Sequence, residues 1–301
     1  MLRRWLRTGI LLGLIAATPV LATVIVSSKL SSESALIGQM IRLVLDAHGI
    51  PTADRMRLGV TSVLRQALLS GEIDLYVEYT GDAAYFFNQP ANPAWKDRRA
   101  GYRLGARLDA EHNHIIWLTP APADDSWALA VRHDVAVANH LRSMSDFARW
   151  VSGGGKVVLA CSAEFANAGT LAALERAYGF RLRPDQMIVL SGGETTAMIA
   201  AAAAGTDGTN TAMVYGTDGG IVAANLVLLT DDRHVEPVYA PVPIVRAAVL
   251  ERYPQIRALL RPVMSGLDDA TLRSLNARVQ IDGESAEAVA ADYLKARGLL
   301  R

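Results

Sequence analysis

Polar and aromatic residues follow several segments that the sequence predicts as β-strands. Four such groups come directly after a predicted strand: Ser27–Ser34, Glu78–Gly81, Glu164–Phe165 and Gly216–Asp218. In α/β sheets, ligands bind beyond the carboxyl ends of the strands, where loops and helix N-termini converge. A single aromatic residue is more often part of a packed core than of a ligand site. The joint position of these groups therefore predicts a binding site for a small polar molecule.

Motifs for catalysis and metal binding do not occur in usable form. Gly153–Lys156 resembles a phosphate-binding loop, but Val157 stands where that loop needs Ser or Thr. His112 and His114 are spaced so that they point to opposite sides of a strand, which does not suit a shared metal ion. Asp207–Asn210 resembles part of a calcium loop but lacks the bidentate glutamate. We therefore expect no catalytic residues, no metal site and no cofactor.

Short β-rich segments alternate with amphipathic helices along the chain, which is typical of α/β architecture. Thr23–Ser28 predicts a buried strand, and the serines after it can cap a helix with an apolar face from Leu36 to Leu45. Further strands are predicted at Ile73–Val77, Ile115–Leu118, Trp127–Arg132, Lys156–Cys161, Ala212–Tyr215 and Leu226–Leu229. From Pro254 onward the pattern is mostly helical.

The composition excludes several classes of protein. The 301 residues are 51% hydrophobic and 20% charged, which is typical of a folded globular chain and not of a disordered one. Thirty Lys and Arg residues balance 30 Asp and Glu residues, so the formal net charge of +0 gives no field for binding nucleic acid. The length favours two domains or one large domain. A single cysteine, Cys161, cannot form an intramolecular disulfide.

Residues 1–22 have the pattern of a cleaved signal peptide. An arginine-rich start precedes an apolar run from Gly9 to Leu21, and Val20–Ala22 fits a signal-peptidase site. The alternative is a membrane anchor, but Pro19 interrupts the run, which is shorter than the ~20 residues that a membrane span needs. No cysteine lies near the cleavage point to carry a lipid. We therefore expect a periplasmic protein that starts near Thr23 and is not a lipoprotein.

Several blocks spread over the chain resemble one known family. They are Leu75–Gly81, Trp117–Ala123, Trp127–Arg132, Ala163–Phe165, Tyr178–Gly179, Tyr215–Gly219, Pro237–Tyr239 and Ala290–Leu294. These blocks are similar to the osmoprotectant-binding proteins of quaternary-amine ABC importers, which bind glycine betaine or choline, and most of all to the low-affinity OsmF-type branch. The resemblance covers the chain from about Thr23 to Leu300.

The resemblance implies the type II periplasmic binding protein fold, an α/β fold in which two lobes are joined by two crossing strands with a ligand cleft between them. Under this interpretation residues 23–128 form the first part of lobe 1, residues 129–233 form lobe 2, and residues 234–301 return to lobe 1 and are mostly helical. The expected crossings are Trp127–Arg132 and Arg233–Tyr239. The second lobe is then an insertion into the first.

The ligand class that the resemblance implies has definite chemical needs. A trimethylammonium group has no N–H to donate, so a protein binds it against several aromatic faces, each worth about 0.5–2 kcal/mol. The aromatic candidates are Tyr79, Trp127, Phe165, Tyr215 and Tyr239. A betaine carboxylate needs the N–H groups of a helix N-terminus and hydroxyl donors. The other residues expected at the site are Ser31, Ser32, Glu33, Thr80, Asn167, Thr217 and Asp218.

The chain departs from the family pattern at three places. Ser31 and Ser34 stand where many relatives carry an aromatic residue and a glutamine. Asp124-Asp125-Ser126 replaces the usual Asn-Asn-Thr and adds acidity beside Trp127, while Asn167–Thr170 replaces a segment that often bears Arg and Asp. Extra negative charge favours a plain cation such as choline over a zwitterion, unless both aspartates face solvent.

The function expected from these observations is that of a monomeric receptor that delivers a quaternary-ammonium osmolyte to the membrane permease subunits of an ABC importer. Three alternatives remain open at this point. The same fold could bind another small polar solute, such as an amino acid or a different osmolyte. It could also act as a stand-alone sensor. An exported enzyme is the third alternative, and it would need a nucleophile–base pair or a metal cluster that the sequence lacks.

Overall fold

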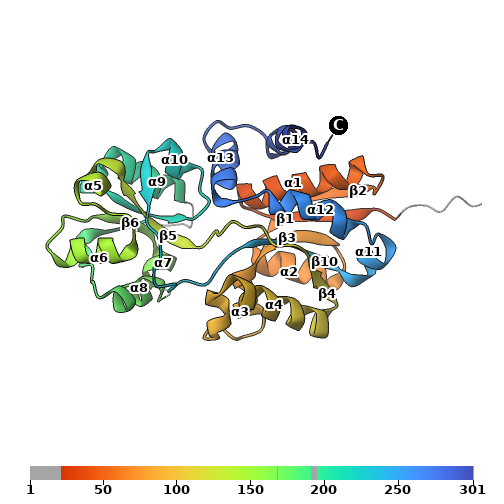
Figure 1. The fold of residues 1–301 in the computed structure, drawn as a ribbon, viewed down its shortest axis with the longest axis horizontal. Coiled ribbons are helices and arrows are strands. Elements are labelled where there is room, and N and C mark those ends of the chain that lie inside the picture. Colours follow the sequence, from red (N-terminus) through yellow and green to blue (C-terminus); the bar gives the residue numbers. More distant parts are fainter. Residues whose placement is uncertain (1–21, 168, 191–194, 301) are drawn as a thin grey trace, which may run out of the picture.

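A computed structural model describes residues 22–167, 169–190 and 195–300. The expected signal peptide therefore lies outside the described residues, except for Ala22. The described chain forms two α/β lobes, each built on a five-stranded sheet, which lie side by side along the long axis of the molecule (Figure 1). This arrangement confirms the two-lobed fold predicted from the sequence.

The first lobe contains a mixed sheet with the strand order β2-β1-β3-β10-β4. Its strands are β1 (Val24–Lys29), β2 (Thr52–Gly59), β3 (Leu75–Tyr79), β4 (Ile115–Trp117) and β10 (Pro241–Arg246). The helices of the same lobe are α1 (Ser32–Ala47), α2 (Thr61–Ser70), α3 (Ala83–Phe86), α4 (Arg98–Asn113), α11 (Ala247–Arg252), α12 (Ile256–Ser265) and α14 (Ala286–Ala296). Buried apolar clusters lie on both faces of this sheet.

The second lobe contains a sheet with the strand order β7-β6-β8-β5-β9. Its strands are β5 (Trp127–Arg132), β6 (Leu159–Ser162), β7 (Met187–Leu190), β8 (Thr211–Tyr215) and β9 (Leu226–Leu228). Its helices are α5 (His133–Ala138), α6 (Met144–Ser152), α7 (Ala163–Asn167), α8 (Thr170–Tyr178), α9 (Thr195–Ala204) and α10 (Gly220–Ala223). One apolar cluster forms the core of this lobe.

Two extended segments connect the lobes. Residues 118–126 lead from β4 to β5, and residues 229–240 lead back from β9 to β10 (Figure 1). The two segments are hydrogen-bonded to each other, since Asp125 N donates to Tyr239 O at 3.0 Å and Ser126 Oγ donates to Pro237 O at 2.7 Å. The first crossing expected from the sequence is wrong. Trp127–Arg132 is β5 itself, because this apolar run pairs in register with β8 inside the second sheet.

Helix α13 (Asp269–Gln280) lies between the two lobes (Figure 1). It packs against α10 of the second lobe and against α1 of the first. Gly219 N donates to Gln280 Oε1 at 3.1 Å, and a Cβ at Gly219 would lie 2.2 Å from Ala277 N. Glycine is therefore required where α13 meets the second lobe, and the returning part of the chain contacts both lobes.

Three strands were not predicted from the sequence, and β10 is the most informative of them. It lies between β3 and β4 although it contains Pro241 and Pro243, which cannot donate to a strand ladder. In an antiparallel pair the N and O atoms of one residue point to the same neighbour. Pro241 O and Pro243 O accept from Ala121 N and Leu118 N, so both prolines face the short β4 side. The positions that alternate with the prolines, Val242 and Ile244, face β3 and pair with Glu78 and Tyr76.

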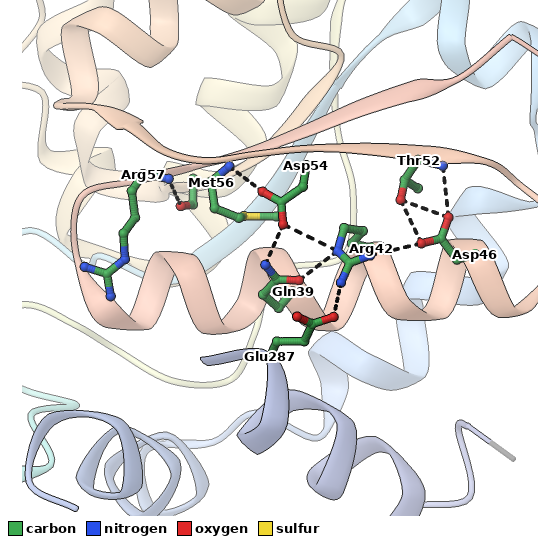
Figure 2. A network of polar contacts seen from close by, with 9 residues as sticks. Gln39, Arg42, Asp46, Thr52, Asp54, Met56, Arg57 and Glu287 are labelled. Carbon is green, nitrogen blue, oxygen red and sulfur yellow. Dashed lines mark hydrogen bonds and ion pairs between the residues drawn. The ribbon is translucent and has the colours of Figure 1, made fainter. Parts of the chain in front are cut away.

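The outer face of the first lobe is held by a polar network around Arg42, which Figure 2 shows. Arg42 on α1 donates to Gln39 Oε1 at 2.8 Å and forms ion pairs with Asp46, Asp54 and Glu287. These partners come from α1, β2 and α14, so the Arg42 guanidinium connects the edge strand β2 and the last helix α14 to α1.

In the described part of the chain, no helix has both the length and the apolarity that a membrane span needs.

We expect Arg42→Met to lower the free energy of unfolding by about 1–2 kcal/mol, because it removes several ion pairs while keeping an apolar stem of similar length. For a chain of this size the melting temperature should fall by roughly 3–6 °C. Arg107→Met is the matched control, since Arg107 is 57% exposed and pairs only with Glu111 one turn away. Equal melting temperatures for the two variants, measured by circular dichroism, would contradict the role given to Arg42.

Candidate ligand site at the lobe junction

Glu33 lies at the centre of the junction between the lobes. It occupies the first turn of α1, where an acidic residue is favoured by the helix dipole, and only 4% of its surface is exposed. Its Oε1 accepts from the Tyr79 hydroxyl at 2.9 Å, and its Oε2 accepts from Asn276 Nδ2 at 2.7 Å. Thr217 Oγ1 of the second lobe is 2.5 Å from Oε2. One carboxylate thus joins β3, α13 and the loop after β8.

Thr217 contacts a second carboxylate as well. Its Oγ1 is hydrogen-bonded to Asp125 Oδ1, which comes from the first crossing segment. A hydroxyl carries one proton and can donate only one hydrogen bond. The other short contact therefore requires a proton on Glu33 or Asp125. Such a proton would leave a carboxylic acid and a carboxylate on the two sides of one threonine.

The electrostatic surroundings agree with this shared proton. Burial, and then the charge of Asp269, raise the pKa of Glu33, while its hydrogen bonds oppose the shift. Burial and the charge of Glu33 raise the pKa of Asp125 well above its ordinary value. The ion pairs of the described residues include neither of these two acids. The site therefore contains negative charge that no lysine or arginine of the described chain neutralises.

Three aromatic rings of the second lobe lie together, and the charge of Asp125 acts on one of them, Tyr215. The Trp127 ring centre is 5.9 Å from that of Phe165 and 6.4 Å from that of Tyr215. Phe165 is fully buried, whereas Trp127 and Tyr215 are half-buried. Trp127 and Tyr215 are neighbours because β5 pairs with β8 at these positions. Electron-rich ring faces near carboxyl groups that have no ion-pair partner form an environment that attracts a cation.

Tyr79 contributes to the junction through its hydroxyl. Its ring already has a cation over one face, since Lys29 Nζ is 4.8 Å from the ring centre. Lys29 is held there by an ion pair with Glu78 and by Asp82 Oδ2 at 2.6 Å. Burial alone would lower the pKa of Lys29, but the charges of Asp82 and Glu78 raise it overall. One face of the Tyr79 ring is therefore occupied by the protein's own ammonium group.

Two other predicted aromatic and hydroxyl residues shape the crossing segments. Tyr239 lies on the second crossing with its ring against Gly81, where a Cβ would come within 2.7 Å of the ring. Thr80 Oγ1 donates to Val238 O at 2.7 Å and accepts from Ala240 N at 3.0 Å. Asp124 Oδ1 accepts from Tyr239 N at 2.9 Å and lies 2.5 Å from Ser126 Oγ. These residues fix the path of the crossings beside the junction.

The remaining predicted residues differ in their distance from the junction. Asp218 is buried, and its Oδ2 accepts from Tyr215 N at 2.8 Å. Ser31 caps α1, since its Oγ accepts from Ser34 N at 3.3 Å, and Ser32 is half-buried one residue before Glu33. Asn167 is exposed and donates to Ala163 O of its own helix at 2.8 Å. Asn167 is therefore tied to its own helix at the surface.

Two residues of the junction were not among the predicted site residues. Asn276 lies in the middle of α13 and reaches the junction only through the packing of that helix, so no strand-end pattern could have indicated it. Asp125 was noted for its charge, and its predicted alternative was exposure to solvent. It is instead half-buried and faces Thr217. The sequence feature that could have indicated this role is the pair Asp124-Asp125 just before the predicted strand Trp127–Arg132.

Two lobes joined by paired crossings, with carboxylates, hydroxyls and aromatic rings at their junction, define a two-lobed solute-binding protein. The family model OpuAC, described as the substrate binding domain of ABC-type glycine betaine transport systems, matches residues 22–296. The chain therefore belongs to this family, which confirms the resemblance stated from the sequence.

Individual relatives agree with the family assignment. The chain is 49% identical to the glycine betaine-binding protein YehZ of Escherichia coli (strain K12) over 288 residues, which cover 95% of this chain and 93% of that protein. It is 30% identical to a glycine-betaine-binding protein of Pseudomonas aeruginosa, with coverage of 92% and 89%. The solved structure of apo YehZ from Escherichia coli matches with a TM-score of 0.84 over 92% of this chain and 99% of the other.

We expect Asp125→Asn to stabilise the ligand-free protein more at pH 8 than at pH 5. Burial and Glu33 raise the pKa of folded Asp125, so the native state binds this proton more tightly than the unfolded state does. The stability that comes from this group is therefore lost as the pH rises. The asparagine removes that loss, and its gain in melting temperature should be about 2 °C larger at pH 8.

The control for this measurement is Asp282→Asn, which makes the same chemical change at an exposed position. Differential scanning fluorimetry at the two pH values provides the comparison. A gain that is equal at both pH values, or larger at pH 5, would show that Asp125 is not held with a raised pKa beside Glu33.

Proposed function

We propose that this protein is the extracytoplasmic receptor of an ABC importer and binds a quaternary-ammonium solute at the lobe junction. The observation that carries the proposal is the uncompensated pair of Glu33 and Asp125 beside the rings of Trp127, Phe165 and Tyr215. A quaternary ammonium group supplies positive charge and needs no hydrogen-bond acceptor. Family membership and the similarity to the glycine betaine-binding protein of E. coli support the same solute class.

The mode of action follows from the connections between the lobes. Among the described residues, the chain passes from one lobe to the other only through the two crossing segments. One lobe can therefore rotate against the other about these segments. A ligand that contacts both lobes binds the closed arrangement more tightly and shifts the population toward it. We propose that the closed, loaded receptor acts as a monomer and is the form that the permease subunits recognise. We propose no catalytic step.

The place of action is proposed from the N-terminal pattern. Export through a cleaved signal peptide, residues 1–22, would deliver the receptor to the periplasm without a lipid anchor. Intact-mass analysis of the periplasmic fraction should give a chain that starts near Thr23. A membrane-bound species that keeps Met1 would contradict this assignment.

The aromatic contribution can be tested by substitution. We expect Trp127→Ala and Tyr215→Ala each to weaken binding of a quaternary-ammonium ligand by roughly tenfold, because each removes one π face worth about 1–2 kcal/mol. Tyr215→Phe keeps the face and should change the affinity much less. Isothermal titration calorimetry against glycine betaine and choline measures these differences.

Trp150→Ala is the matched control, because Trp150 is a half-buried tryptophan that packs against the core of the same lobe, next to Phe147. It should lower the melting temperature and leave the affinity unchanged. If Trp127→Ala and Tyr215→Ala behave as Trp150→Ala does, the three rings are core residues and the solute binds elsewhere.

A further inference from the structure

The polar donors at the junction are already engaged by a carboxylate of the protein. Glu33 receives the Tyr79 hydroxyl and the Asn276 amide, and Thr217 Oγ1 lies 2.5 Å from it. Two hydroxyls and one amide that converge from separate elements are the donor set that a free carboxylate group needs. Glu33 therefore occupies the position that the carboxylate of a betaine would otherwise use.

A ligand carboxylate would also meet unfavourable charge here. Glu33 and Asp125 contact the two sides of Thr217, and Asp218 lies on the same loop. Glu33 and Asp125 would repel a third carboxylate group at short range, because charges inside the protein are only weakly screened. A ligand that carries only positive charge would instead neutralise the acids already present.

Two buried polar atoms at the junction have no hydrogen-bond partner among the described residues. Asn276 is 1% exposed, and its hydrogen bonds to Glu33 Oε2 and Thr217 O both use Nδ2, which leaves Oδ1 as an acceptor without a donor. Trp127 Nε1 has no acceptor in full hydrogen-bond geometry, although the Tyr215 hydroxyl lies close enough to interact with Trp127. A hydroxyl group can serve either atom, because it both donates and accepts. A carboxylate can serve only the tryptophan, and glycine betaine has no hydrogen to donate.

We infer that Glu33 acts as a built-in carboxylate that makes the site selective for a methylated ammonium cation bearing a hydroxyl group and no carboxylate. Choline is the simplest molecule of this class. The inference rests on the proposed function, since it concerns the same site and the same solute class. It assigns Glu33 as the residue that discriminates cations from zwitterions, in addition to its contact between the lobes.

The test is a calorimetric titration of the mature protein with three ligands: choline, tetramethylammonium and glycine betaine. The wild type should bind choline at least about tenfold more tightly than glycine betaine, because only the zwitterion brings a carboxylate to the acidic pair. Tetramethylammonium has the charge but no hydroxyl and should lie between the two. This order separates the effect of charge from that of the hydroxyl donor.

Glu33→Gln provides the decisive variant, since it keeps the size of the side chain and an acceptor oxygen but removes the charge. We expect the preference for choline over glycine betaine to fall at least about tenfold in this variant. Asp125→Asn should also lower the preference for choline over glycine betaine, and it replaces Glu33→Gln in the test if that variant does not fold. Glu72→Gln is the matched control at an exposed position of the same lobe and should leave the preference unchanged.

The outcomes separate this inference from the proposed function. Tighter binding of glycine betaine than of choline by the wild type overturns the inference while a quaternary-ammonium receptor stands. Equal changes for all three ligands in Glu33→Gln also overturn it, because a residue that only joined the lobes would act on every ligand alike. Absence of binding for all three ligands, in the wild type and in both variants, refutes the proposed function itself.

Discussion

The contact that the rest of the structure depends on is the single hydroxyl of Thr217, which lies between two carboxyl groups. Glu33 reaches it from the first turn of α1, and Asp125 reaches it from the first crossing segment. Because one hydroxyl proton cannot satisfy two carboxylates, the junction must hold either an extra proton or a cation. The charge state of the site is therefore tied to whether the lobes are in contact and to what lies between them.

The fold is arranged so that these groups can approach. The carboxyl end of β1 leads directly into α1, which places Glu33 at the edge of the first sheet that faces the second. Gly216 allows the loop after β8 to pass the first crossing, since a Cβ there would lie 2.3 Å from Asp124 O. Helix α13 then covers the loop, with Arg273 Nη1 donating to Gly216 O at 2.6 Å. Close backbone approach, and not a deep apolar core, brings the lobes together.

Much of this could be predicted from the sequence where local pattern and tertiary role agree. Tyr215 ends the predicted strand Ala212–Tyr215, and Tyr79 follows the predicted strand Ile73–Val77 by two residues, so their place at a sheet edge follows from the position of the strand end. The central strand β10 could not be predicted, because its two prolines argue against any strand until the short β4 is known to lie beside it. Asn276 could not be predicted either, because a residue in mid-helix reaches the junction only through how α13 packs. Local pattern indicates strand ends, whereas contacts made by packing of distant helices leave no local trace.

The acidic junction also explains how an empty receptor can attract its solute. In the proposed hinge motion, opening the lobes would break the contacts of Thr217 and expose Glu33 and Asp125 to water, which would remove the burial that raises their pKa values. In the proposed open arrangement both groups would be solvated carboxylates, so the site would carry two negative charges beside the rings of Trp127 and Tyr215. Closure without a ligand requires one proton to be taken up again, whereas closure on a cation does not. Under the proposed function, binding of a cation and closure of the lobes are therefore coupled through the same two carboxylates, and a neutral zwitterion would provide that coupling less effectively.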